Sequence, residues 1–275
     1  MAVYVITGVS KGLGFEFTKQ LSSDPKNLIV GLVRNKSATE KKIKQELPTR
    51  SNIHILHADL SNHASIKQAA ADTALIVGDR GVDVLLANAG LVSYFDGFTA
   101  IGELCSKQTN RTRNLRPHDL FQTNVIGNIH LFHAFLPLVL ASPAPTKRVV
   151  TITSGVADLD LTNEVEIDIG ALYSASKAAM NLVVAKFSVQ YKKDGVVFMG
   201  ISPGLVEVGH YDGVSEEEMK GMMAFVQKLQ KYAPHFKGPI TPEESVRAVR
   251  SVWENATVEK DAGAFVSHLG NKQWV

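Results

Sequence analysis

Short apolar runs alternate along the chain with longer stretches whose apolar positions repeat at helical spacing. The short runs are rich in β-branched residues and predict strands at Val3–Thr7, Leu28–Val33, Ile53–His57, Val84–Ala87, Arg148–Thr153, Val196–Ser202 and Ala264–Ser267. The intervening stretches predict helices at Gly14–Ser22, Ala38–Leu47, Ser65–Ile76, Asp119–Leu140, Leu172–Lys192 and Glu243–Asn255. Continuously apolar strands that alternate with helices are typical of a parallel sheet covered on both faces. With right-handed crossovers, the pattern predicts an α/β fold, a doubly wound parallel seven-stranded sheet in a single domain over residues 1–275.

Two segments interrupt this alternation. Ala157–Gly170 contains five acidic residues and is predicted to be a loop, which either borders a binding site or is a solvated insertion. Residues 206–237 contain a predicted helix at Ser215–Lys231, flanked by glycines and a proline. Long excursions in compact domains are often binding loops, so we expect a substrate loop or lid at 206–237, with a surface insertion as the alternative.

Composition and charge narrow the classes of partner. Hydrophobic residues make up 45% and charged residues 20% of the 275 positions, as in ordinary globular proteins. The formal net charge of +2 is spread along the chain, which argues against a nucleic-acid or polybasic membrane surface. Cys105 is the single cysteine, so no intrachain disulfide can form and a reducing compartment is favoured. The scattered histidines lack the spacing of a metal site.

Targeting signals are not evident in the sequence. The first predicted strand begins almost at Met1, which leaves no room for a signal peptide. The most apolar long run, Ile129–Leu140, includes two histidines and a proline and is too short to span a bilayer. We therefore expect a cytoplasmic protein without a membrane partner.

A glycine-rich turn follows the first predicted strand and opens the first predicted helix. It reads Thr7-Gly8-Val9-Ser10-Lys11-Gly12-Leu13-Gly14. Glycine lets a phosphate approach the backbone closely, and the helix N-terminus offers unpaired N–H groups to a pyrophosphate. Glycine-rich turns also serve purely conformational needs, but this strand–turn–helix context favours dinucleotide binding and a Rossmann fold.

The spacing T-G-x-x-x-G-x-G resembles that of the short-chain dehydrogenase/reductase family. Further matches occur in order at Asp59-Leu60, at Asn88-Ala89-Gly90 and at the turn Ser202-Pro203-Gly204-Leu205-Val206, which resembles the turn of fungal NADPH-dependent carbonyl and benzil reductases. Ala87 departs from the family's Asn at that position. The resemblance implies cofactor contacts by Thr7, Gly8, Ser10, Lys11, Gly12, Leu13, Gly14, Arg34, Asp59, Leu60, Asn88, Ala89, Gly90, Tyr173, Lys177, Pro203, Gly204 and Val206.

The segment Tyr173-Ser174-Ala175-Ser176-Lys177 carries the strongest chemical signal. Four residues separate Tyr173 from Lys177, so a helix places both side chains on one face. A nearby ammonium would lower the pKa of the tyrosine and make it a better acid–base catalyst at neutral pH. The alternative is a surface Tyr and a surface Lys at ordinary helical spacing, and the other matches argue against it.

Two more residues complete the catalytic tetrad that the resemblance implies. Ser154 ends the fifth predicted strand, where its hydroxyl could bind a substrate oxygen. It precedes Tyr173 by nineteen residues, a longer interval than in most relatives, because the acidic segment lies between them. Asn124 matches the helix asparagine that holds a water in the family's proton relay, and it could also satisfy buried backbone groups.

The second predicted strand bears on the choice of cofactor. It ends without an acid at Val33 or Arg34, whereas NAD enzymes normally place a carboxylate there to bind the ribose hydroxyls. Arg34 and Lys11 could pair with a 2′-phosphate, or they could be solvated charges. Some NAD-using relatives also carry Arg at this position, so the missing acid is the stronger observation. We expect NADP(H).

The expected reaction is hydride transfer from NADPH to a carbonyl carbon, with Tyr173 as the proton donor. The substrate would be a ketone or aldehyde with an apolar body, or the corresponding alcohol, bordered by Ser154, Val156, Tyr173, Gly204 and parts of Tyr94–Phe95 and Val206–Phe225. Isomerase, lyase or cyclisation chemistry at the same site is one alternative, and a non-catalytic NADP-binding sensor is another. Pairing through the two long helices would give a homodimer or homotetramer.

Overall fold

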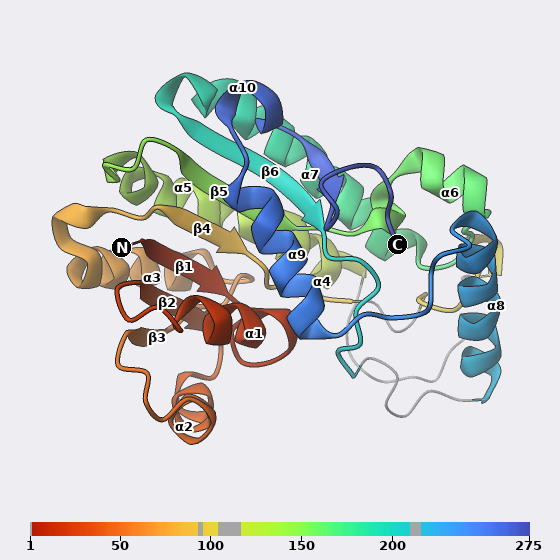
Figure 1. Cartoon of the computed structure of the whole chain (residues 1–275), viewed down its shortest axis with the longest axis horizontal. Coiled ribbons are helices and arrows are strands. Elements are labelled where there is room, and N and C mark those ends of the chain that lie inside the picture. Colours follow the sequence, from red (N-terminus) through yellow and green to blue (C-terminus); the bar gives the residue numbers. More distant parts are fainter. Residues whose placement is uncertain (1, 93–95, 104–116, 210–215) are drawn as a thin grey trace.

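One parallel sheet of seven strands forms the centre of the computed structural model, which describes residues 2–92, 96–103, 117–209 and 216–275 (Figure 1). The strand order is β3-β2-β1-β4-β5-β6-β7, and every neighbouring pair is parallel. The strands are β1 Val3–Thr7, β2 Leu28–Val33, β3 Ile53–His57, β4 Val84–Ala87, β5 Lys147–Ile152, β6 Val196–Ser202 and β7 Phe265–Ser267. The predicted fold class is confirmed, with shifts of one residue at the limits of β5 and β7.

The strand order reverses direction between β1 and β4, which are neighbours in the sheet. Successive connections run one way from β1 to β3 and the other way from β4 to β7. At such a reversal, the loops that follow two adjacent strands turn to opposite faces and leave a crevice at the carboxyl edge. The topology thus places the glycine turn after β1 beside Asn88 after β4.

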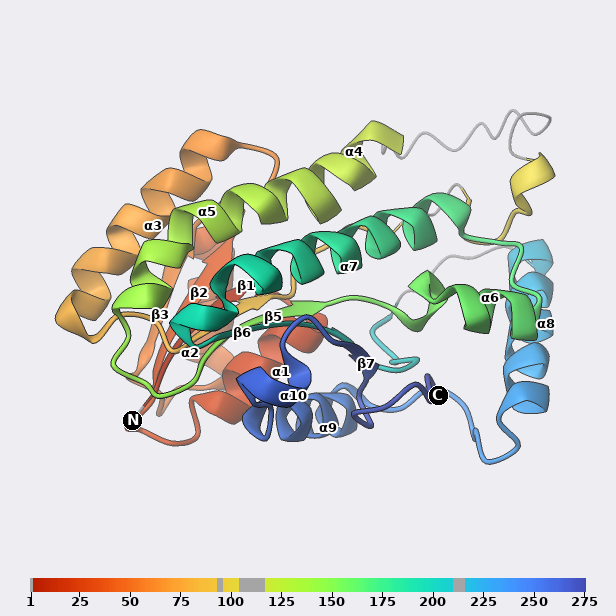
Figure 2. The same ribbon diagram turned by 90° about the horizontal axis from the view of Figure 1, so that it is seen from above.

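Helices cover both faces of the sheet (Figure 2). One face carries α3 His63–Val77, α5 Gly127–Ala141 and α7 Ala171–Tyr191, whose apolar side chains pack around Phe132 and Phe198. The other face carries α1 Gly12–Leu21, α2 Lys36–Glu46, α9 Pro242–Glu254 and the short α10 Val258–Asp261. There Phe17 and Trp253 meet with ring centroids 5.3 Å apart. The core is therefore two apolar layers separated by the sheet.

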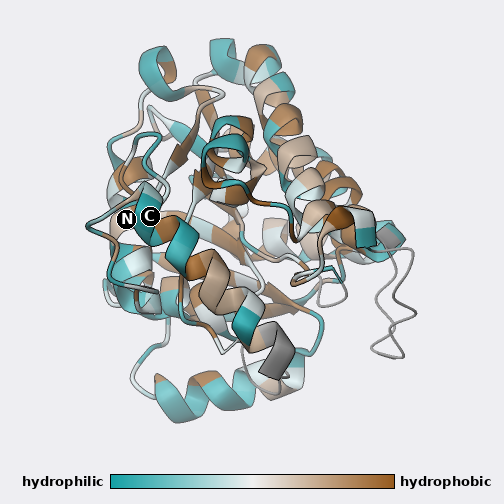
Figure 3. Cartoon of the chain, turned by 90° about the vertical axis from the view of Figure 1, so that its right-hand side faces the viewer, coloured by the Kyte–Doolittle hydropathy of each residue, from teal (hydrophilic) through white to brown (hydrophobic). Residues whose placement is uncertain are grey.

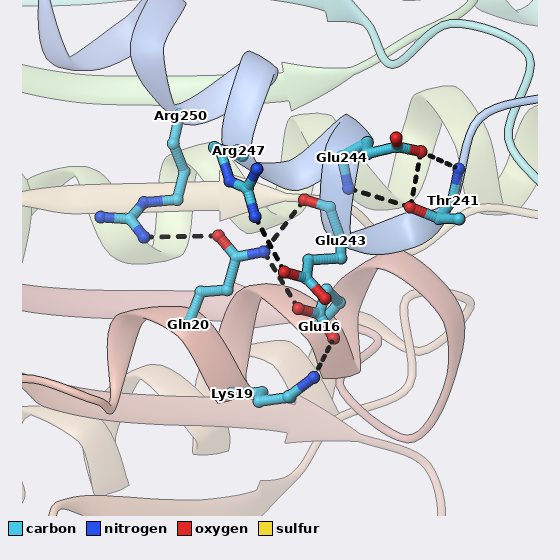
Figure 4. Close-up of polar contacts among 8 residues, drawn as sticks. All are labelled: Glu16, Lys19, Gln20, Thr241, Glu243, Glu244, Arg247 and Arg250. Carbon is cyan, nitrogen blue, oxygen red and sulfur yellow. Dashed lines mark hydrogen bonds and ion pairs between the residues drawn. The ribbon is translucent and has the colours of Figure 1, made fainter.

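Polar contacts fasten α1, the helix that follows the glycine turn, to α9 (Figure 4). The Gln20 amide nitrogen donates to Glu16 Oε1 at 2.9 Å and to the Glu243 carbonyl at 3.1 Å. A capping box begins α9, in which Thr241 and Glu244 each accept from the other's backbone N–H. The contact from Gln20 therefore holds the last turn of α1 against the start of α9.

The acidic segment is not the loop that its composition predicts. A short 3-10 turn, Gly155–Ala157, leads into helix α6, Leu159–Val165, whose first turn is capped by Asp158 accepting from the Leu161 N–H at 3.0 Å. Leu161 and Val165 lie one turn apart and are buried against the region of α8. The loop prediction was wrong because the many acids obscure a single apolar stripe on a very short helix.

Helix α8, Glu216–Tyr232, lies beside α6 at one end of the molecule, within the predicted loop or lid (Figures 1 and 2). Figure 3 shows hydrophobic and hydrophilic bands along this helix. Leu229 and the following Ala233 and Phe236 are buried in a third apolar cluster with residues of α6. Within the described residues, the lid prediction thus corresponds to a helix packed at the end of the sheet.

One helical stretch in the described part of the chain, His118–Ala141, is long and apolar enough to cross a membrane by length and composition. Its most apolar window has a mean hydropathy of 1.5 and is half buried in the fold, as core helices often are. Such a stretch is weak evidence for a membrane span.

Candidate active site

A cleft of about 770 Å³ lies along the carboxyl edge of the sheet. It extends from the glycine turn after β1, past the ends of β4 and β5, to α7 and α8. Its walls include all the residues predicted to contact cofactor except Gly14, and all the predicted tetrad except Asn124. The structure therefore brings together in one cleft residues that lie up to about 200 positions apart in the sequence.

The glycine turn is held against the end of β4 by hydrogen bonds. Thr7 Oγ1 accepts from the N–H groups of Asn88 and Ala89 at 3.0 and 2.9 Å, and the Asn88 amide donates to the Thr7 carbonyl at 2.9 Å. Gly8 has φ of 77°, a conformation that favours glycine. Any Cβ at Gly14 would lie 2.2 Å from the Gly8 carbonyl oxygen. Gly14 thus lies behind the turn and shapes it without lining the cleft.

Tyr173 and Lys177 lie on the first turns of α7 and both face the cleft. Lys177 Nζ donates to the Ile152 carbonyl at 2.9 Å and lies 5.7 Å from the centre of the Tyr173 ring. Lys177 is buried, whereas Tyr173 is partly exposed to the cleft. The helical spacing of the pair therefore places both functional groups at the end of β5, as predicted.

The predicted lowering of the tyrosine pKa is wrong for this structure. Burial raises the pKa of Tyr173 to about 12, and a side-chain hydrogen bond with Ser154 opposes that rise. Burial also lowers the pKa of Lys177 to about 8. Desolvation is the larger effect on both groups, and the opposing hydrogen bond with Ser154 does not overcome it for Tyr173. A high pKa keeps Tyr173 protonated at neutral pH, the form that can donate a proton.

Asn124 lies in a π-helical segment, Gln122–Ile126, between α4 Pro117–Phe121 and α5. Its side chain bonds the Leu91 backbone twice, accepting from N–H at 2.7 Å and donating to the carbonyl at 2.9 Å. It also donates to Ser176 Oγ at 3.1 Å. The predicted single helix is therefore interrupted, and such interruptions often mark functional sites. The amide joins the segment after β4 to the helix that carries Tyr173.

The end of the cleft beside β2 and β3 carries the predicted positive charges. Arg34 and Lys11 are exposed on its wall. Asp59 accepts from the backbone and hydroxyl of Ser61 at 2.9 and 2.7 Å. Burial alone would raise the pKa of Asp59, but these bonds and the charge of Arg34 bring it below its usual value. The site offers cations to an anionic group and keeps its one nearby carboxylate engaged in a local turn.

Comparison with known proteins agrees with this geometry. A model of the short chain dehydrogenase family matches residues 2–219. The chain belongs to that family. It is 58% identical to the short-chain dehydrogenase/reductase iacC of Pestalotiopsis fici and 50% identical to the short chain dehydrogenase virK of Hypocrea virens, with full coverage of both chains in each case. The resemblance drawn from the glycine turn is thereby confirmed, and the protein is an oxidoreductase of the short-chain dehydrogenase/reductase family.

Solved structures show the same fold. An NADPH-bound carbonyl reductase from chicken fatty liver aligns with a TM-score of 0.75 at 20% identity, over 98% of each chain. The carbonyl reductase Sniffer of Drosophila melanogaster also aligns with a TM-score of 0.75, at 22% identity over 98% of each chain. The roles of individual residues in this member of the short-chain dehydrogenase/reductase family stay predictions.

One residue near the site was missed by sequence reasoning. Asp96 is fully buried in the loop after β4, and its Oδ2 accepts from the Leu172 N–H at 2.8 Å, next to Tyr173. Its backbone carbonyl accepts from Gly170, also at 2.8 Å. Gly170 is the N-cap of α7 and has no side chain to cap it. Asp96 therefore caps α7 from 76 residues away, a relation that local capping patterns do not contain.

We expect Asp96→Ala to lower the free energy of unfolding by about 1–2 kcal/mol, because the first turn of α7 loses its capping carboxylate. Asp96→Asn keeps an oxygen acceptor and should lose less. Urea unfolding of both variants checks this. Equal losses for the two variants would show that the charge, and not the acceptor, supplies the stabilisation, and no loss in either would contradict the capping role.

Parts of the predicted substrate border lie outside the described residues, namely Tyr94–Phe95 and residues 210–215 of the predicted lid. Within the described residues, Ser154, Val156, Tyr173, Gly204, Val206 and Phe225 line the cleft, as expected for this border. Met222 also lines it, with Ile167 and Ile169 from the segment after α6. These two isoleucines had no predicted role, because their segment was read as a polar loop.

Proposed function

We propose that this member of the short-chain dehydrogenase/reductase family reduces a ketone or aldehyde with NADPH. The observation that carries the proposal is a single cleft that joins the glycine turn to Ser154, Tyr173 and Lys177. The glycine turn is the feature that binds a dinucleotide, and the group of Ser154, Tyr173 and Lys177 is the feature that gives a proton to a carbonyl oxygen. Their place at one edge of the sheet brings both within reach of one bound cofactor.

The residues present fit such a cofactor. Gly8, with φ of 77°, and Gly12, the first residue of α1, both line the cleft, so the N-terminus of α1 can offer its N–H groups to a pyrophosphate. A Cβ at Gly90 would lie 3.3 Å from Lys177 Nζ, so a side chain there would crowd the lysine on its path to a ribose. The nicotinamide, when bound, supplies the hydride.

The protein's own groups supply orientation and the proton. Ser154 would donate a hydrogen bond to the substrate oxygen and hold it beside Tyr173. The Tyr173 hydroxyl would give its proton to that oxygen as negative charge develops, leaving a phenolate. The Lys177 ammonium would stabilise this phenolate and bind the ribose hydroxyls.

NADP is proposed over NAD because Arg34 lies on the wall of the cleft where the second strand ends, with no acid at that position. An arginine side chain can donate two hydrogen bonds to a 2′-phosphate. A neutral ribose hydroxyl gains much less from the same arginine. Arg34→Ala should therefore weaken NADPH binding at least tenfold, by the roughly 1.4 kcal/mol or more that a charged hydrogen bond contributes, and leave NADH binding unchanged. Fluorescence titration of both nucleotides measures this, and an equal effect on both would argue against a 2′-phosphate site.

The substrate is proposed to be neutral and apolar apart from its carbonyl. The wall opposite the glycine turn is formed by Phe98, Val156, Ile167, Ile169, Leu205, Met222, Phe225 and Val226. Among the described residues of the cleft, the charged ones are Lys11, Arg34, Asp59, Asp119 and Lys177, and none belongs to this wall. Among these described wall residues, an acidic or cationic substrate body would find no charged partner.

NADPH affinity should fall as the pH rises through about 8, the value to which burial lowers the pKa of Lys177. Oxygen atoms of the bound cofactor favour the charged ammonium, so binding raises that pKa and takes up a proton. Above pH 8 the Lys177 amine is mostly neutral and must take up a proton before it can bind the cofactor. NADPH affinity should therefore fall by up to about tenfold per pH unit. Titrations from pH 6.5 to 9.5 check this, and Lys177→Met should bind more weakly with little dependence on pH in that range.

The deciding experiment is a turnover assay. Absorbance at 340 nm is followed with NADPH and with NADH against aldehydes, simple ketones and aromatic α-diketones. We expect carbonyl-dependent oxidation of NADPH and greater kcat/KM for the apolar diketones. Tight NADPH binding without turnover would favour the isomerase, lyase or sensor alternatives, and failure of both nucleotides to bind would refute the proposal.

A further inference from the structure

A tryptophan near the end of the sequence packs directly behind the predicted catalytic serine. Residues 268–275 form no helix or strand, and Asn271, Lys272 and Gln273 are exposed. Trp274 follows them and is only 3% exposed. A large indole buried at the end of an irregular segment needs a specific place, because its apolar area must be covered by neighbouring side chains.

That place is formed by the turn after β5 and by β7. The indole stacks on Phe265 with ring centroids 4.6 Å apart. A Cβ built on Gly155 would lie 3.0 Å from Trp274 Cβ and 3.2 Å from its Cγ, so the backbone of Gly155 is already in contact with the indole. Gly155 directly follows Ser154, and its N–H donates to Ser202 Oγ at 2.9 Å. The Ser154–Gly155 turn is thus held between β6 on one side and Trp274 on the other.

The same segment joins the two helices at the substrate end of the cleft. Trp274 shares a buried cluster with Leu161 and Val165 of α6 and with Leu229 of α8. Lys272 Nζ lies 3.1 Å from Oδ2 of Asp158, the N-cap of α6. The Val275 carbonyl lies 3.3 Å from His235 Nε2, just beyond α8. Three contacts of different kinds therefore fasten the segment to both helices.

We propose that Trp274 is a positioning residue that holds Ser154 in place for carbonyl reduction. The inference rests on the proposed function. A hydroxyl that orients a substrate must be held to within a fraction of an ångström, and misplacement by about 1 Å can reduce turnover by roughly 100-fold. The turn after β5 has no side chain of its own at Gly155 to pack beneath it, so the indole supplies that support.

Trp274→Ala should lower kcat for carbonyl reduction by roughly 10- to 100-fold. NADPH affinity should change little, because the glycine turn lies at the other end of the cleft. Trp274→Phe keeps an aromatic ring against Phe265 and Gly155 and should restore most of kcat. A purely structural role would reduce the amount of folded protein but leave the kcat of the folded, NADPH-binding fraction unchanged.

Gly155→Ala tests the same contact from the other side. Its added methyl group would press on Trp274, so the variant alone should lower kcat. In a Trp274→Gly background both the Cβ at 3.0 Å and the Cγ at 3.2 Å are gone, so the methyl group has room and Gly155→Ala should reduce kcat much less. Non-additive effects of this kind are expected only for residues in contact. Gln273→Ala is a matched control, because it changes the exposed neighbour of Trp274 and leaves the buried cluster around the indole intact.

The outcomes separate this proposal from the proposed function. If the wild-type protein reduces no carbonyl compound, the proposed function fails and the positioning role falls with it. If the wild type is active and Trp274→Ala keeps its kcat, or if Gly155→Ala and Trp274→Gly prove additive, only the positioning role is overturned. A loss of kcat with intact NADPH binding, recovered in Trp274→Phe, supports it.

Discussion

Tyr173→Phe should lower kcat for NADPH-dependent carbonyl reduction by roughly 10²- to 10⁴-fold, the range that a positioned general acid contributes. The substitution removes one oxygen and leaves the ring packed on α7. NADPH should bind with nearly unchanged affinity, because the hydrogen bond from Lys177 Nζ to the Ile152 carbonyl does not depend on the tyrosine hydroxyl. Steady-state assays at 340 nm and NADPH titration measure the two quantities separately.

Tyr191→Phe is the matched control. Tyr191 ends the same helix, outside the cleft, and its hydroxyl accepts a hydrogen bond from Gln190 at 3.1 Å. Its kcat should equal that of the wild type. If Tyr173→Phe retained more than about a tenth of the wild-type kcat, another group or water would be the proton donor and the proposed role of Tyr173 would be wrong.

The pKa of Tyr173 predicts how each direction of the proposed reaction depends on pH. Burial raises that pKa to about 12, so the phenol form prevails throughout the neutral range. Reduction needs the phenol as donor, whereas alcohol oxidation needs the phenolate as base. Oxidation should therefore increase with pH well above neutrality, and reduction should not need an alkaline medium. The bound cofactor's positive nicotinamide would shift this balance toward phenolate only in the oxidative direction.

Features of the fold that depend on local periodicity could be predicted from the sequence. The strand β2 is buried at every position, and its continuous apolar run is typical of a strand in a parallel sheet covered on both faces. Tyr173 and Lys177 were found because helical spacing alone places them together. The glycine turn was found because its position between a strand and a helix is itself the signal.

Features that depend on contacts between distant segments could not be predicted. The cap that Asp96 provides for α7 joins residues 76 positions apart. The indole of Trp274, near the end of the sequence, contacts Gly155 in its middle. The π-helical turn around Asn124 follows from the bonds of its side chain to Leu91 and Ser176, which appear only when the sheet has formed. Helix α6 was missed for a local reason, since its apolar stripe consists of only two buried residues.

Gly14 and Gly221 both lie on helices, but only Gly14 is packed so closely that a side chain would not fit. A Cβ at Gly14, in α1, would lie 2.2 Å from the Gly8 carbonyl oxygen and 2.6 Å from Asn88 Nδ2. Both atoms belong to the framework of the glycine turn, so neither can move without displacing the cofactor-binding backbone. A Cβ at Gly221, in α8, would have its nearest neighbour, Phe98 Cβ, at 4.0 Å.

Gly14→Ala should lower the free energy of unfolding by roughly 1–3 kcal/mol or more, because overpacking against backbone cannot relax through a side-chain rotation. NADPH binding should weaken at least tenfold, since the turn that receives the pyrophosphate is pushed apart. Gly221→Ala should instead be neutral or stabilise by up to about 1 kcal/mol, the usual preference of a helix for alanine. Urea unfolding and NADPH titration of both variants check these opposite signs. If Gly14→Ala were as well tolerated as Gly221→Ala, the turn would have more freedom than its contacts allow, and its assignment as a rigid pyrophosphate cradle would have to be abandoned.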